Sequence, residues 1–514
     1  MMKLLMDEDS AFLNWVRLCD IDSYYSVNLQ KKRSEIANPL YYASLAGLTE
    51  ASYALLEMGA DINAWGGYYG NALYGAINGG HEGTVKLLIE KGADVNAQGG
   101  YYKNPLQAAL YKGNEAIAKL LIEKGADVNA QGGEYGNALQ AASYKGNKDI
   151  VKQLIEKGAD VNAQGGGYGN ALYAAIYGGH EEIARLLMEK EADVNAQGGW
   201  YGNALQAASY GGHEAITKVL IEKGAHVNAQ GGYYGNALYA AVYGGHQAIA
   251  KLLIERGADV NAQGGEYGNL LQTAVYNGNQ TMAKLLIEEG ADVNGLGGYY
   301  GNALQAASYK GNESMAKLLI EEGADVNGRG GGYGNPLYAA IYGGHEAITK
   351  LLIEKGADLN VQGGKYGNPL QTAVYKGNEA IAKLLIVNGA DINAQGGEYG
   401  TLLQRVLYKG NKAIAKFLIE NGADVNAQGG KYGNLLQRVI YEGNEAIAKF
   451  LIKNGADVNA QGGEYGNPLQ IAVYKGNKAI AKLLIERGAD VVFSSPVKSS
   501  FFPSKRGNWQ PQPV

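Results

Sequence analysis

The 33 residues from Asn104 to Gly136 read NPLQAALYKGNEAIAKLLIEKGADVNAQGGEYG, and this stretch decides the fold. Asn104 followed by Pro105 predicts the start of a helix, because Asn is a favoured N-cap and Pro is favoured just inside a helix. Gly113 follows the eight residues Pro105–Lys112 and predicts the end of this first helix.

A second helix is predicted from Glu115 to Lys124, with Asn114 as its cap. Ile117, Leu120 and Leu121 are spaced i, i+3, i+4, so one face of this helix is apolar. Gly125 ends the helix, and the Gly-rich stretch that follows predicts a protruding hairpin loop.

This pattern recurs with a period of 33 residues and without a slip. A pair of helices of about ten residues cannot bury its apolar face alone, so the repeats must stack on one another. The sequence therefore predicts an all-α helical repeat solenoid of about 14 copies. The Gly-Ala-Asp-Val-Asn string marks each copy, and its third position is Asp61, Asp94, Asp127, Asp160, Asp193, His226, Asp259, Asp292, Asp325, Asp358, Asp391, Asp424, Asp457 and Asp490.

Three segments follow from the limits of the repeat. Residues 38–490 form the array, and residues 1–37 are expected to be an N-terminal capping segment with an amphipathic helix. Residues 491–514 contain Pro, Ser and a Lys-Arg pair and read as a disordered C-terminal tail.

The composition excludes several functional classes. The net charge of −5 is a poor match for nucleic acid, and no apolar run is long enough to cross a membrane. The single cysteine, Cys19, excludes a disulfide framework, and we expect an intracellular protein, cytoplasmic or nuclear. We expect a monomer.

Catalytic and ligand-binding motifs are absent from the sequence. His81, His180, His213, His246 and His345 share one repeated position, which Asn fills elsewhere, and we interpret it as a capping slot before the second helix. The Gly-rich loops lack the Gly-Lys-Ser/Thr of a P-loop. We therefore expect no enzymatic activity, no metal and no cofactor, and we expect Asp127 and its equivalents to bond to hairpin N–H groups.

The array resembles the ankyrin repeat family, whose unit is also 33 residues. The family's Thr-Pro-Leu-His opening is matched by Asn104-Pro105-Leu106-Gln107, and its Gly-His by Gly80-His81 and four further copies. Its Leu-Leu-x-x-x-Gly-Ala-Asp-Val-Asn-Ala ending is matched by Leu120–Ala130. The loop Gln-Gly-Gly-x-Tyr-Gly departs from the family's hairpin. The resemblance implies an ankyrin-type fold, a concave binding face made of hairpin tips and first helices, and a protein or peptide partner.

The phrase Asn-Ala-Gln-Gly-Gly-x-Tyr-Gly-Asn-Ala-Leu-Gln also resembles ankyrin arrays of filamentous fungi. In those proteins such arrays often follow a nucleotide-binding domain of immune-receptor type. An alternative function is therefore the sensor arm of such a receptor, present here without its nucleotide-binding domain.

Two features of the hairpin and first helix are candidates for partner contact. A Tyr recurs in every hairpin, from Tyr69 to Tyr465, and predicts a framework of stacked rings. The residue before it varies sharply, and exposed aromatic residues there are typical of interfaces, although neutral drift is the alternative. The resulting tip candidates are Tyr68, Tyr101, Trp200, Tyr233 and Tyr299.

A second Tyr row ends each first helix and is often followed by Lys. This row predicts either the floor of a binding groove or simple packing between helices. Near the C-terminus, Arg405 and Arg438 stand one helical turn before a Tyr of this row, so each is expected to share its face. They predict a basic aromatic patch for an acidic peptide, or else mark two recently duplicated repeats. The residues of this row and patch singled out for partner contact are Tyr111, Lys112, Tyr144, Lys145, Arg405, Tyr408, Lys409, Arg438 and Tyr441.

Overall fold

The computed structural model describes residues 36–99, 102–264, 268–362, 367–394, 401–408, 410–428, 433–462 and 466–491. The predicted capping segment and the predicted tail therefore lie almost entirely outside the described residues, and both stay predictions. The chain divides into an N-terminal unit, Met1–Asp292, and a C-terminal unit, Val293–Val514.

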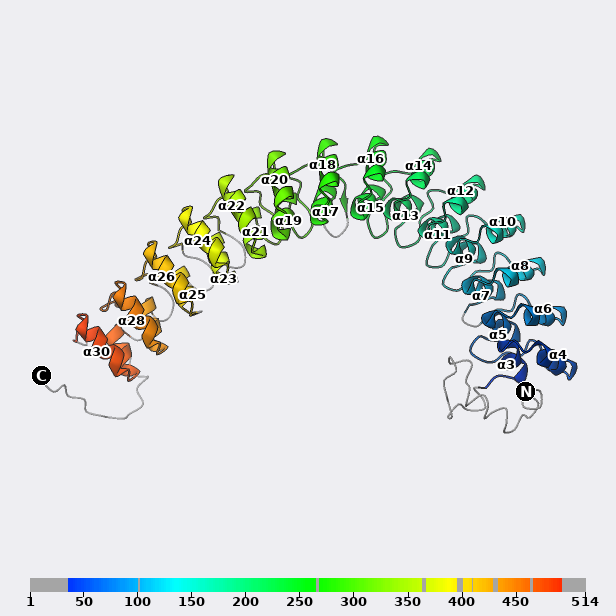
Figure 1. Cartoon of the computed structure of the whole chain (residues 1–514), viewed down its shortest axis with the longest axis horizontal. Helices are drawn as coiled ribbons and strands as arrows, with labels where there is room; N and C mark the ends of the chain where they lie inside the picture. Colours follow the sequence, from blue (N-terminus) through cyan, green and yellow to red (C-terminus); the bar gives the residue numbers. More distant parts are fainter. Residues whose placement is uncertain are drawn as a thin grey trace. The chain divides into compact units, whose positions relative to one another are not determined.

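The N-terminal unit consists of stacked helix pairs, with the first helices in one row and the second helices in the other (Figure 1). The first helices are α3 (Pro39–Leu45), α5 (Ala72–Gly79), α7 (Pro105–Lys112), α9 (Ala138–Lys145), α11 (Ala171–Tyr177), α13 (Ala204–Gly211), α15 (Ala237–Gly244) and α17 (Leu270–Tyr276). The second helices are α4 (Thr49–Glu57), α6 (Glu82–Glu90), α8 (Glu115–Glu123), α10 (Lys148–Glu156), α12 (Glu181–Glu189), α14 (Glu214–Glu222), α16 (Gln247–Glu255) and α18 (Gln280–Glu288).

The C-terminal unit repeats the same arrangement. Its first helices are α19 (Ala303–Lys310), α21 (Pro336–Gly343), α23 (Pro369–Lys376), α25 (Leu402–Tyr408), α27 (Leu435–Tyr441) and α29 (Pro468–Tyr474). Its second helices are α20 (Glu313–Glu321), α22 (Glu346–Glu354), α24 (Glu379–Val387), α26 (Lys412–Glu420), α28 (Glu445–Lys453) and α30 (Lys478–Glu486). The predicted helical repeat fold is confirmed.

Each first helix begins and ends as its sequence indicates. In α7 the Asn104 side chain accepts a hydrogen bond from the Gln107 N–H at 2.8 Å, and Pro105 occupies the first turn. Gly113 ends the helix at φ +75°, a left-handed conformation that favours glycine. The Asn N-cap is therefore confirmed.

The core runs along the row of first helices and between the two rows. Leu106 and Leu110 of α7 and Leu121 of α8 are at most 1% exposed. Ala108 and Ala109 are fully buried, and their small side chains let neighbouring first helices approach closely. Burying one Leu contributes about 1.5–3 kcal/mol, so each repeat depends on both neighbours for its stability.

A short antiparallel hairpin joins consecutive repeats. The Gly132 N–H donates to the Gly136 carbonyl at 2.7 Å, which closes the loop after α8. One such hairpin contains the paired strands β1 (Gln263–Gly264) and β2 (Gly268–Asn269). The predicted hairpin loop is confirmed.

Candidate functional site

The hairpin tips are tied to one another through the backbone. The Tyr233 N–H donates to the Trp200 carbonyl at 3.1 Å, and the Gly167 N–H donates to the Glu134 carbonyl at 2.9 Å. In the C-terminal unit the Gly332 N–H donates to the Tyr299 carbonyl at 2.8 Å. These bonds use no side chain of a tip residue, so they hold the tips side by side whatever side chain each tip carries.

The described tip aromatics are strongly exposed. Trp200 is 74% exposed and its neighbour Tyr233 is 65% exposed, while Tyr68 and Tyr299 are about 60% exposed. Each exposed Tyr ring stands edge-on to the hairpin Tyr that follows it, with ring centroids 5.0 Å apart for Tyr233 and Tyr234. The remaining tip candidate, Tyr101, lies outside the described residues.

The two Tyr rows of the sequence form one interleaved series of rings, which we call the Tyr stack. At Tyr135, Tyr168, Tyr201, Tyr234 and Tyr333 the hairpin ring lies between the helix-end Tyr of its own repeat and that of the repeat before, so the predicted framework of stacked rings is confirmed there. Centroids of consecutive rings are 4.6–5.7 Å apart in the N-terminal unit. The members there are Tyr102, Tyr111, Tyr135, Tyr144, Tyr168, Tyr177, Tyr201, Tyr210, Tyr234 and Tyr243, and Tyr300, Tyr309, Tyr333 and Tyr342 continue the pattern in the C-terminal unit.

Several hairpin phenols of the Tyr stack have a pKa above the ordinary value. Burial raises the pKa of Tyr135 to about 12, and the Glu134 carboxylate adds to the rise. Burial likewise raises the pKa of Tyr168 and Tyr234. The stack therefore presents neutral ring faces, edges and hydroxyls to a partner.

Cations lie on rings of the preceding repeat. The Lys376 Nζ is 3.3 Å from the Tyr342 centroid, and the Lys475 Nζ is 3.8 Å from the Tyr441 centroid. Lys145, which is exposed, lies 5.6 Å from the Tyr111 centroid. The first helices contain no Asp or Glu, so this surface combines aromatic and basic character.

The arginines do not form the single open patch expected from the sequence. Arg405 is only 6% exposed, and its guanidinium carbon lies 4.2 Å from the centroid of Tyr375, in the preceding repeat. Arg438 pairs with Glu442 at 3.0 Å. The side chain of Tyr408 and the whole of Lys409 lie outside the described residues. Arg405 is thus largely hidden from solvent and Arg438 is paired within its own helix, while the acidic-peptide hypothesis stays a prediction.

The slot before the second helix joins repeats more often than it caps. The Nε2 atoms of His180, His246 and His345 lie 2.8 Å from carbonyl oxygens of the preceding repeat, and these side chains cap no helix. Asn114 also donates to the preceding repeat, at 2.9 Å to the Ile77 carbonyl. The predicted capping role is wrong for these residues, because their side chains reach back across the interface. The predicted cap is confirmed at Asn279, Asn312, Asn411, Asn444 and Asn477.

A polar ladder missed by the sequence reasoning also crosses the repeats. The Asn96 Oδ1 accepts from the Asp127 N–H at 2.7 Å, and its Nδ2 donates to the Gly125 carbonyl at 3.2 Å. Asp127 accepts from the Asn129 N–H at 2.9 Å, as predicted. The sequence contained a signal for this ladder. The Asn of Gly-Ala-Asp-Val-Asn recurs along the array, although an exposed position without a structural role would be free to vary.

In several first helices a buried Gln or Tyr holds the following hairpin. The Gln140 Nε2 donates to the carbonyls of Ala163 and Gly169, at 3.1 and 3.0 Å. Where Tyr replaces Gln, the hydroxyl takes over part of this role, as in the 2.9 Å bond from Tyr74 to the Ala97 carbonyl. The hairpins are therefore set on a frame with many cross-repeat hydrogen bonds.

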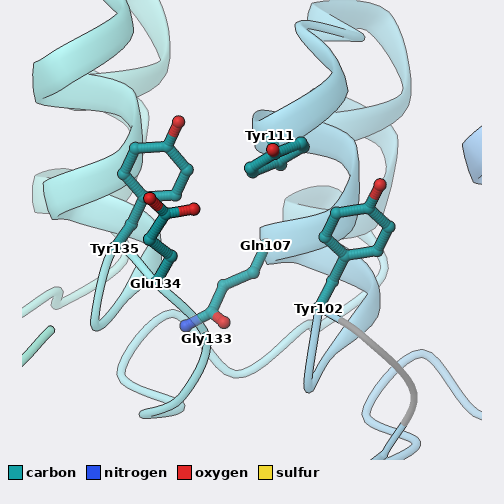
Figure 2. A pocket seen from close by; sticks show the side chains of 6 residues that line it. All are labelled: Tyr102, Gln107, Tyr111, Gly133, Glu134 and Tyr135. Atoms are coloured by element: carbon teal, nitrogen blue, oxygen red, sulfur yellow. The ribbon is translucent and has the colours of Figure 1, made fainter. Parts of the chain in front are cut away.

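A small cavity opens between the hairpins of two neighbouring repeats in the N-terminal unit (Figure 2). Its volume is about 210 Å³, and three rings of the Tyr stack surround it. The lining residues are Tyr102, Gln107, Tyr111, Gly133, Glu134 and Tyr135. Among the described residues no group of His, Cys, Asp and Glu side chains could hold a metal ion, and no helix is long and apolar enough to span a membrane.

Comparisons with known proteins identify the family to which these repeats belong. A family model that describes three consecutive ankyrin repeats matches the chain at residues 2–99, 66–132, 106–198, 197–264, 264–330, 328–396 and 402–494. The azaphilone pigments biosynthesis cluster protein L of Monascus ruber is 36% identical over 95 residues, which are 16% of this chain and 20% of that protein. The chain thus spans about a fifth of the length of this relative. The human ASB11 ankyrin repeat domain is 23% identical, with a TM-score of 0.38, covering 43% of this chain and 99% of that one.

Proposed function

Because the chain belongs to the ankyrin repeat family, we propose that it is a non-enzymatic scaffold that binds a protein or peptide partner. The partner contacts the hairpin tips and the exposed edge of the Tyr stack. Ankyrin repeats generally serve as protein-interaction scaffolds, and the described residues contain no group suited to metal chemistry.

The neighbouring tips Trp200 and Tyr233 carry this proposal. Large aromatic side chains that are 74% and 65% exposed are costly in water, and Trp and Tyr are enriched among the residues that dominate binding energy. The hydrogen bond between the two tip backbones fixes their positions before a partner arrives. Such preorganisation reduces the entropy lost on binding.

The test is unbiased partner capture with the full chain, followed by titration of the identified partner. Trp200→Ala combined with Tyr233→Ala is expected to weaken binding about 30-fold, since truncating such residues costs about 2 kcal/mol or more. Val387→Ala is the matched control, because Val387 is 77% exposed but lies at the end of the second helix α24. Unchanged affinity in the double variant would remove the tips from the binding surface.

The sensor arm of an immune-type receptor is a finer form of the same proposal. It rests on the resemblance of the repeated phrase to fungal arrays. Reading the genomic sequence beside this coding region for a nucleotide-binding P-loop domain tests it.

A further inference from the structure

The cavity in Figure 2 contains a hydrogen-bond acceptor without a partner. Gln107 is 4% exposed, and its Nε2 donates to the carbonyls of Ala130 and Gly136, at 3.2 and 3.1 Å. These two bonds fix the orientation of the amide, and among the residues that the structure describes no group donates to Oε1. A buried acceptor left in this state is unfavourable, so a donor is expected to reach it.

The unpaired oxygen has a cause in the sequence. In α9 the equivalent Oε1, that of Gln140, accepts from the Asn137 N–H at 3.2 Å. The Gln140 Oε1 can reach the Asn137 N–H only because the residue before the cap is Gly136. A Cβ on Gly136 would lie 2.0 Å from the Gln140 Oε1. Lys103 takes this glycine's place before α7, at φ +72°. Its Cβ excludes the capping-box position, and α7 lacks the box.

The other lining groups favour a cation that carries N–H donors. The rings of Tyr102 and Tyr111 have centroids 5.0 Å apart, those of Tyr111 and Tyr135 are 5.6 Å apart, and ring faces attract cations. Glu134 supplies a carboxylate at the rim, and in the view of Figure 2 its head lies over the Tyr135 ring, with the Gln107 amide below. Among the described hairpins, only this one has a carboxylate at its tip, and the first helix before it carries the Gln acceptor.

We propose that this cavity receives the ammonium group of a lysine side chain of the protein partner. The ammonium donates to the Gln107 Oε1 and to the Glu134 carboxylate, and its remaining surface lies against the three rings. A volume of about 210 Å³ is smaller than the roughly 300 Å³ at which drug-sized ligand sites begin, and it suits one side chain. This inference rests on the proposed scaffold function and names one feature of the partner.

Lys145 stands close to this site but is not among the residues that line it. Its Nζ lies 5.6 Å from the Tyr111 centroid and 6.0 Å from the Tyr135 centroid. Its positive charge opposes a second cation on the same rings. Lys145→Met is therefore expected to tighten binding of the lysine probe, and weaker binding would contradict the site.

The probe is Nα-acetyl-lysine amide, titrated against the full chain by ligand-observed saturation-transfer NMR, in parallel with its trimethylated form. We expect saturable binding of the unmodified probe. The trimethylated form is expected to bind about tenfold more weakly, because it has no N–H for the Gln107 Oε1. The absence of saturable binding, or equal affinity for the two forms, would overturn the proposal.

Two variants separate the site from general damage to the fold. Glu134→Gln at an exposed tip is expected to weaken binding about tenfold, because a charged hydrogen-bond acceptor becomes neutral. Lys103→Gly is expected to restore the capping box, to pair the Gln107 Oε1 with the Asn104 N–H, and to abolish lysine binding while slowing local hydrogen exchange. An affinity for the lysine probe equal to that of the parent chain, in either variant, would refute the assignment.

The probe experiment does not require the natural partner, so its outcome is independent of the proposed function. Partner capture that depends on Trp200 and Tyr233 but not on Glu134 would support the scaffold and overturn the lysine site. Lysine binding without any effect of the two tip aromatics on partner affinity would support the lysine site and contradict the tip assignment.

Discussion

Replacing Gln140 by Met tests whether the buried Gln of each first helix holds the hairpin that follows. Gln140 is fully buried and its side chain makes three hydrogen bonds, to the Asn137 N–H and to the carbonyls of Ala163 and Gly169. Met has similar length but forms none of them. At about 1 kcal/mol for each bond, the change is expected to destabilise the local structure by about 3 kcal/mol.

The assay is native-state hydrogen exchange, because a repeat array need not unfold in a single two-state step. The Gly165 N–H, which donates to the Gly169 carbonyl at 2.8 Å, reports on the affected hairpin. A loss of about 3 kcal/mol corresponds to roughly 100-fold faster exchange if this amide exchanges through local opening.

Gln107→Met is the matched control, because the Gln107 side chain makes two such bonds and its Oε1 makes none. It is expected to cost about 2 kcal/mol, which is roughly 30-fold faster exchange at the Gly132 N–H. Equal acceleration in the two variants, or less than about threefold at Gly165, would refute the count of bonds on which the reasoning depends.

Two further predictions concern a glycine and a histidine. Gly199→Ala is expected to be about 1–3 kcal/mol more destabilising than Gly158→Ala, because its Cβ would lie 2.3 Å from the Tyr173 Cε1, whereas a Cβ on Gly158 meets nothing within 4 Å. Both glycines have φ between +70° and +90°, so their backbone cost cancels in a comparison of thermal unfolding, and equal losses would contradict the clash. Burial lowers the pKa of His213, with Glu181 opposing the change and His246 adding to it, so the unfolded chain binds more protons near its ordinary pKa of about 6.5. The difference in free energy of unfolding between the parent chain and His213→Asn is expected to be constant above about pH 6.5 and to move against the parent as the pH falls through this value. Parallel curves of unfolding free energy from pH 5 to 8 would contradict this.

Local signals were sufficient to predict the fold. The Asn and Pro before α7, the glycine after it and the apolar spacing in α8 each specify one boundary or face, and they recur in register along the array. The stacked rings were predicted for the same reason, since Tyr69 and its equivalents occupy one position in every repeat. These features depend on residues within one repeat or on identical neighbours.

Contacts between unlike positions of neighbouring repeats could not be predicted in the same way. The Asn96 side chain contacts the backbone 29 and 31 residues later, and His180 bonds to a carbonyl 36 residues earlier. Such contacts depend on the offset between stacked repeats, which the period alone does not give. The pairing of Arg438 with Glu442 was predictable, because the two residues are four apart on one helix.

The frame also explains why the tips can vary. Hairpins are held by hydrogen bonds to backbone groups, from a buried Gln or Tyr of the preceding repeat and, in three pairs of tips, from the next tip. The tip side chain takes no part in these bonds, so Glu134, Gly167, Trp200 and Tyr233 can occupy equivalent positions without disturbing the fold. Variation at the tips therefore costs little stability and is available for recognition.

Lys103 shows the opposite case, in which a frame position departs from its pattern. A non-glycine residue at φ +72° costs about 1–2 kcal/mol of backbone strain, and here it also leaves the Gln107 oxygen unpaired. The backbone strain and the unpaired oxygen occur at one repeat, beside a cavity with a carboxylate at its rim. Proteins retain such unfavourable features at functional sites. If Lys103→Gly only stabilised the chain and left every binding property unchanged, the departure would have no functional benefit, and the link between strain and recognition at this repeat would fail.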